Sequence, residues 1–205
     1  QRRRLIQIND IRKASPMSDS PRNPAAADAA EAPFRPFDTL IDEARALATL
    51  RSALAGADDG ELFLERRRSE ALVLDDGRIR SASYNASEGF GLRAVRGEVA
   101  GYAHSTTISE AALARAARTA RLAVGAGGGV MAPPPAGASA QLYGGGDPLR
   151  DASFAARVDL LREIDAHARD IDPAVVQVSA TLSASHQEIE ILRPEGLRLA
   201  DVRPM

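Results

Sequence analysis

Three histidines, His104, His167 and His186, are the side chains of this sequence best suited to metal binding or proton transfer near neutral pH. His104 ends a predicted strand, His167 lies at the edge of the apolar stripe of a predicted helix, and His186 opens the last strand region. None has a second histidine or a carboxylate at a spacing that would place both ligands on one face of an element. We therefore expect each histidine to be structural or solvated.

Other motifs of catalysis and cofactor binding are missing. Cysteine is absent, which excludes disulfides, thiolate nucleophiles and cysteine-ligated metals within this chain. Neither a G-x-S-x-G elbow nor a Walker loop occurs. The segment "EGFGLR" supplies Gly89 and Gly91 but no third glycine at dinucleotide-binding spacing. The acidic pairs at 58–59 and 75–76 fall in predicted turns, where Asp is favoured because it forms local hydrogen bonds.

The stretch "EGFGLRAVRGEVAGYAHSTTIS" at 88–109 is unusually rich in glycine. We interpret Gly97 as a turn residue. We interpret Gly89, Gly91 and Gly101 as strand positions where the chain bends or another backbone comes close. A second interpretation stays open: these three bare strand positions could line a substrate cleft in which an extended peptide pairs by strand addition.

Hydrophobic periodicity divides the chain into helices and strands. Helical spacing predicts three helices, at 38–56, 109–124 and 151–171. Asp38 or Thr39 is the expected N-cap of the first helix and Ser109 that of the second. Alternation and turn signals, above all Asp76-Gly77, predict five strands between the first two helices and three after the last. The sequence therefore predicts an α+β fold, an antiparallel β-meander sheet with helices packed on one face.

The composition is that of an ordinary globular domain. Hydrophobic residues make up 44% and charged residues 26%, and the net charge is −2, so we expect neither nucleic acid nor a membrane as partner. No apolar run reaches the length of a membrane helix and no signal peptide is visible, so we expect a cytoplasmic protein.

The chain divides into a tail and one domain. Residues 1–36 lack apolar periodicity and are rich in Ala, Pro and Arg, so we expect a disordered, dispensable amino-terminal tail. Within it, 1–16 is a candidate for sequence upstream of a natural start at Met17. We expect one folded domain at 37–205, which contains a Gly/Pro-rich loop at 125–150.

Three segments, at 60–124, at 142–149 ("LYGGGDPL") and at 197–205 ("LRLADVRPM"), resemble the amino-terminal half of TldD/PmbA-type metalloproteases. The resemblance runs from about residue 37 to the last residue and is TldD-like. It implies the amino-terminal domain of a bacterial cytoplasmic zinc protease that processes small or unfolded peptides, including peptide-antibiotic precursors. It also implies a dimer, either a homodimer or a heterodimer of TldD-like and PmbA-like subunits. An older label of the family is modulator of DNA gyrase.

The family's zinc site has no counterpart in this sequence. That site is an H-E-x-x-x-H helix plus a cysteine in the carboxy-terminal half, whereas this chain has no two histidines at i and i+5 and no cysteine. The resemblance therefore assigns no catalytic or metal-binding residue here. We expect a chain truncated before the metal-binding half, without a cofactor and inactive by itself, with zinc bound only in the full-length protein.

Two functions of different classes stay open. The favoured one is the non-catalytic amino-terminal portion of a TldD-like zinc metalloprotease. The other is a free-standing peptide-binding or regulatory module that lacks protease activity. Nucleic-acid binding has little support, because the net charge is negative and the sequence contains only three Tyr, five Phe and no Trp.

Overall fold

A single six-stranded sheet runs through the molecule. The computed structural model describes residues 4–9, 33–125 and 142–205. The strands are β1 (Arg4–Asn9), β2 (Asp59–Asp75), β3 (Arg78–Arg96), β4 (Val99–Ser105), β5 (Val175–Leu192) and β6 (Arg198–Pro204). The helices are α1 (Pro36–Thr39), α2 (Glu43–Ala53), α3 (Glu110–Val124) and α4 (Phe154–Ile171). The strand order is β1-β5-β2-β3-β4, and β6 also pairs with β5.

Three strands of 17, 19 and 18 residues, β2, β3 and β5, form the axis of the sheet. Each is roughly 60 Å long at the usual rise per residue. The sequence analysis expected more and shorter strands: "RIRSASYN" and "FGLRAV" are both parts of β3, and "VVQVSATLSA" and "QEIEIL" are both parts of β5. Neither Gly89, between the first two segments, nor Ser185-His186, between the last two, ends a strand, because β2 pairs continuously with β3 on one side and β5 on the other.

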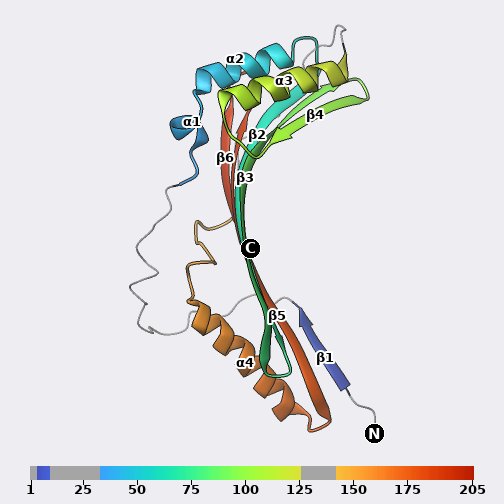
Figure 1. Cartoon of the computed structure of the whole chain (residues 1–205), viewed down its shortest axis with the longest axis vertical. Helices are drawn as coiled ribbons and strands as arrows, with labels where there is room; N and C mark the ends of the chain where they lie inside the picture. The colour runs from blue at the N-terminus through green and yellow to red at the C-terminus, as the bar shows by residue number, and fades with distance from the viewer. Residues whose placement is uncertain (1–3, 10–32, 126–141) are drawn as a thin grey trace.

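Alternation along β2 places all helices on one face of the sheet. Leu62 and Leu64 belong to the core that α2 and α3 cover, whereas Leu72 and Leu74 belong to a separate core that α4 covers. These four residues are an even number of positions apart, so they point to the same face. Figure 1 shows α2 and α3 at one end of the sheet and α4 at the other.

The pairing confirms the predicted α+β fold. The hairpins β2-β3 and β3-β4 form an antiparallel meander, β5 pairs antiparallel with β2, and helices pack on one face. The predicted Asp76-Gly77 turn joins β2 to β3, with both residues at positive φ. Among the helices that the structure describes, none combines the length and apolarity that a membrane crossing requires.

The helix ends follow their capping residues. Ser109 caps α3 as predicted, because its hydroxyl accepts a hydrogen bond from the Ala112 N–H. The first helix begins later than predicted. Its N-cap is Asp42, whose carboxylate accepts from the Arg45 N–H at 2.8 Å, and the predicted caps Asp38 and Thr39 lie in the separate α1.

Two segments of the expected disordered tail are structured. β1 pairs in parallel with β5, from Arg4 opposite Val175 to Asn9 opposite Thr181. Phe34 is buried in the core beside α1. The structure therefore differs from the expected disorder of residues 1–36 at both segments. Residues 10–32, and 126–141 of the predicted loop, lie outside the described residues.

An ion-pair network joins the three long strands at the start of β2. Arg193, directly after β5, and Arg93 of β3 both bind Asp59 of β2, with N–O distances of 2.8 and 3.0 Å. Arg93 also binds Glu61 at 3.1 Å. Burial alone would raise the pKa of Asp59, but Arg193, the Gly60 backbone N–H and Arg93 together outweigh it and hold that pKa below its ordinary value of 3.8.

We expect Asp59 to stabilise the fold only while it is ionised. Because its pKa is lower in the folded than in the unfolded state, its contribution is complete above the unfolded pKa and is lost as the pH falls through the folded pKa. The free-energy difference between the wild type and Asp59→Asn, measured by urea unfolding, should therefore shrink between about pH 6 and about pH 2. The exposed Asp159, changed to Asn, is the control and should change the unfolding free energy little, because its ion pair with Arg162 is exposed on both sides. A pH-independent difference for Asp59→Asn would contradict the prediction.

Candidate functional site

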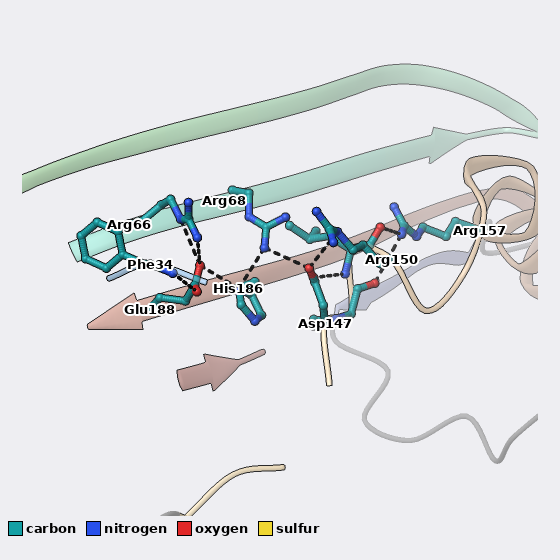
Figure 2. Close-up of polar contacts among 10 residues, drawn as sticks. Phe34, Arg66, Arg68, Asp147, Arg150, Arg157, His186 and Glu188 are labelled. Atoms are coloured by element: carbon teal, nitrogen blue, oxygen red, sulfur yellow. Dashed lines mark hydrogen bonds and ion pairs between the residues drawn. The ribbon is translucent and has the colours of Figure 1, made fainter. Parts of the chain in front are cut away.

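The middle of the helix-covered face carries charged rather than apolar side chains. They come from β2, from β5, from the segment that leads into α4 and from α4 itself, and they lie in a row along the strands (Figure 2). We call this group the waist cluster: Arg66, Arg68, Glu70, Asp147, Arg150, Arg157, His186 and Glu188.

Cross-strand pairing brings the first members together. Arg66 of β2 lies directly opposite Glu188 of β5 and binds its carboxylate through Nε at 3.0 Å and Nη2 at 2.9 Å. The other carboxylate oxygen accepts the backbone N–H of Phe34 at 2.9 Å, and the Arg66 guanidinium lies 5.4 Å from the Phe34 ring centroid. Glu188 thus holds the chain segment before α1 against the sheet.

The centre of the cluster joins β2, β5 and the segment before α4. Arg68 lies opposite His186, and its Nη2 is 2.9 Å from the Asp147 carboxylate and 3.1 Å from His186 Nδ1. A guanidinium only donates, so Nδ1 accepts and the proton of a neutral imidazole sits on Nε2. Asp147 also accepts the Leu149 N–H at 3.0 Å and lies 3.4 Å from Arg150.

Arg157 of α4 completes the cluster. Its side chain is 8% exposed and pairs with Glu70 of β2. It also donates to the backbone carbonyls of Pro148, Leu149 and Ala152. A single buried guanidinium therefore ties the first turn of α4, the segment before it and β2 together.

The chemistry of the waist cluster is that of attachment. Its three carboxylates, Glu70, Asp147 and Glu188, are each paired with arginine. Such an arrangement neutralises buried charge and orients backbone segments. The sequence analysis missed it, although the alternation in "ERRRSE" and "SHQEIE" held the signal: the charged positions come into register only when β2 and β5 pair.

The histidines do not converge. His104 lies on β4, His167 on α4 and His186 on β5. The described part of the chain contains no group of three or more His, Cys, Asp or Glu residues placed to hold a metal ion. These residues therefore do not fit the zinc site that the family resemblance implies for the full-length protein.

The three glycines of the candidate substrate cleft lie on β3 and β4. Gly89 faces the backbone at the end of β4, where an added Cβ would lie 2.5 Å from the Ser105 carbonyl oxygen. Gly91 lies under the Tyr102 ring. Gly101 lies under α3, where an added Cβ would lie 2.4 Å from the Ala120 carbonyl oxygen. All three glycines thus lie where another part of this chain comes close. This is what the interpretation as bends or close approaches in the strands predicts.

A pocket of about 390 Å³ lies next to these glycines, between β4 and α3. Its polar lining groups are Tyr102, His104, Ser105, Arg115 and Thr119. The Tyr102 and His104 rings stack with centroids 5.7 Å apart. Small α3 side chains leave this space open, and the lining offers hydrogen-bond donors and one cation but no carboxylate.

Two family models match the chain. The model described as PmbA/TldA metallopeptidase domain 1 matches residues 60–124, and the model described as PmbA/TldA metallopeptidase central domain matches residues 147–205. The chain belongs to the PmbA/TldD family. The first match contains nearly all of β2 with β3, β4 and α3, and the second contains α4, β5 and β6.

Sequence relatives also connect the chain with this family. The chain is 31% identical over 151 residues to a protein named metalloprotease TldD homolog from Haemophilus influenzae, and 30% identical over 148 residues to one from Buchnera aphidicola (subspecies Acyrthosiphon pisum). Each alignment covers 72% of this chain but only 31% of the relative.

Solved structures share the fold. TldE from Thermococcus kodakarensis superposes with a TM-score of 0.59 at 18% identity, over 78% of this chain and 37% of that one. A protein named as a candidate modulator of DNA gyrase from Bacteroides thetaiotaomicron superposes with a TM-score of 0.58 at 14% identity, over 80% of this chain and 39% of that one.

We expect the buried Arg157 to be far more important for stability than the exposed Arg162 on the same helix. Arg157→Met leaves Glu70 and three carbonyls without their donor, so it should cost about 3 kcal/mol or more of unfolding free energy. Arg162→Met breaks an ion pair whose partners are both 63% exposed and should cost less than about 1 kcal/mol. Urea unfolding of both variants measures the difference. Equal losses of unfolding free energy would show that Arg157 stabilises the fold no more than an exposed arginine does.

The packing role of the glycines predicts an order of destabilisation. Gly101→Ala pushes against the helix backbone of α3, so it should cost about 1–3 kcal/mol. Gly91→Ala should cost less, because the Tyr102 side chain that blocks it is 61% exposed and can swing away. Gly144→Ala has nothing within 4 Å and should be close to neutral. Thermal or urea unfolding gives the order; a larger loss at Gly91 than at Gly101 would contradict this explanation.

Proposed function

We propose that this chain is the non-catalytic amino-terminal portion of a TldD-like zinc metalloprotease that acts on small or unfolded peptides. The observation that carries this proposal is the 31% identity to a protein named metalloprotease TldD homolog. The chain spans 31% of that relative, and its sequence has neither the H-E-x-x-x-H motif nor cysteine. We therefore assign zinc binding and peptide hydrolysis to the remainder of the longer protein.

Within such a protein, this chain supplies a frame. The waist cluster locks the segment before α4 onto the long sheet, which keeps the two helix-covered ends in one continuous structure. We place the protein in the cytoplasm, as a homodimer or paired with a PmbA-like subunit. The candidate substrate cleft at Gly89, Gly91 and Gly101 belongs to this proposal; the pocket and the outer edge of β4 beside it support it, because a strand edge can accept an extended peptide.

The alternative, a free-standing peptide-binding or regulatory module, draws on the same pocket and strand edge. Both lie within this chain and need no residue from elsewhere. The two functions differ in what the chain does by itself: the frame has no measurable affinity for peptides in isolation, whereas the module binds them without cleaving them.

Purified, tag-free chain distinguishes these functions. We expect elemental analysis after dialysis to find no near-stoichiometric zinc, and we expect unfolded peptides to stay intact in its presence, because the sequence has no cysteine and its three histidines lie on three different elements. Fluorescence anisotropy with labelled unfolded peptides measures binding. Thr119→Trp fills the pocket, and Ala111→Trp on the exposed side of α3 is the matched control. Retained zinc or cleavage would overturn the proposal, and binding that only Thr119→Trp abolishes would favour the module.

A further inference from the structure

The outer edge of β4 carries backbone groups that are available for pairing. A two-residue turn joins β3 to β4, which makes Arg96 and Val99 a hydrogen-bonded pair. Such pairs recur at every second residue of an antiparallel ladder. Ala103 therefore bonds to β3, whereas the N–H and C=O groups of Tyr102 and His104 point outward. Within the described ranges, no strand pairs with this edge.

The two faces of β4 offer different surroundings to an added strand. Ala103 belongs to the core under α3, so the alternating side chains of Tyr102 and His104 point to the face without helices. Tyr102 is 61% exposed there. Directly opposed residues of neighbouring strands have their side chains on the same face. The residue of an added strand that lies opposite Ala103 therefore points toward α3, and the residues on either side of it contact Tyr102 and His104.

α3 presents an unpaired cation beside that position. Arg115 lines the pocket between β4 and α3, and the lining contains no carboxylate. In the part of the chain that the structure describes, no ion pair engages the guanidinium of Arg115. The only acidic residue of α3, Glu110, is held by Arg45 of α2 at 3.0 Å. The charge of Arg115 is therefore left for a carboxylate from outside.

We propose that the outer edge of β4 binds an extended acidic peptide, with an Asp or Glu residue opposite Ala103 and its carboxylate on the Arg115 guanidinium. The peptide backbone pairs with Tyr102 and His104, which is recognition by strand addition. The two residues that flank the acidic one are β-branched or aromatic, because such side chains pack well across from an aromatic ring. This proposal rests on the peptide-binding module, the second of the proposed functions, and specifies its ligand.

Charge and backbone together favour this ligand over others. A strand laid on the edge removes water from Arg115, which is costly unless a carboxylate arrives with it. A guanidinium and a carboxylate also form strong, charge-assisted hydrogen bonds. A basic side chain at the same position would be repelled. A small anion would satisfy Arg115 but would leave the outward N–H and C=O groups of Tyr102 and His104 unused.

Fluorescence anisotropy with two labelled peptides tests the acidic preference. The probes are acetyl-Thr-Val-Glu-Val-Thr-amide and its counterpart with Gln in place of Glu, titrated with the full chain. We expect the Glu peptide to bind about fivefold more tightly than the Gln peptide. Arg115→Gln should abolish this preference. Arg118→Gln is the matched control and should keep it, because Arg118 is an unpaired arginine of the same helix that does not line the pocket.

The outcomes separate this proposal from the function on which it rests. Binding of neither peptide would exclude the module, and the acidic ligand with it, but would not bear on the amino-terminal frame. Equal affinity for the two peptides would overturn the acidic preference and leave the module standing. Equal effects of Arg115→Gln and Arg118→Gln would overturn it too, because they would show attraction to the helix as a whole rather than a site at Arg115.

Hydrogen exchange, measured by NMR, tests the position of the peptide. At nine-tenths occupancy by the Glu peptide, the amides of Tyr102 and His104 should exchange about tenfold more slowly, because only the free fraction exchanges. The Ala103 amide, which already bonds to β3, should change little. Protection of residues 80–88 of β3 instead, the stretch before its pairing with β4 begins at Phe90, would place the peptide on another edge and overturn the proposal.

Discussion

Continuous pairing of β2 with β3 and β5 is the constraint on which the rest of the structure depends. Strands of 17 to 19 residues are about three times the common length. No single helix pair can cover so long a face. Two apolar cores therefore form, one under α2 and α3 and one under α4, and the face between them must be stabilised by something other than hydrophobic burial.

The waist cluster meets that need with charges that satisfy one another. Buried ion pairs are costly to desolvate, so they persist only when each partner has several hydrogen bonds. Arg157, with one carboxylate and three carbonyls, and Glu188, with one guanidinium and one N–H, both have them. The cluster also joins the two family-matched segments: Arg66, Arg68 and Glu70 come from the first, and their partners come from the second or from Phe34.

The family of this chain and the arrangement of its side chains bear on different parts of its function. Family and relatives connect the chain with metallopeptidases, while the described residues hold no arrangement of ligands for a metal. This portion offers a continuous sheet with two edges that no other strand covers among the described residues: the outer edge of β4 beside the pocket, and the middle of β3. An elongated sheet with open edges is suited to assembly and to the capture of extended chains.

Local signals in the sequence determined much of the fold. Ser109 caps its helix and Asp76-Gly77 forms its hairpin, as predicted. The apolar periods correctly predicted helices on one face of an antiparallel sheet. Each of these features depends on neighbours within a few residues. The family was also recognisable from the sequence. Only the tertiary structure decided how far the strands extend, because strand continuation depends on a pairing partner more than on local sequence. It alone joined Arg68 to His186, 118 positions away, and to Asp147, 79 positions away, since no periodicity reports which strand lies beside which.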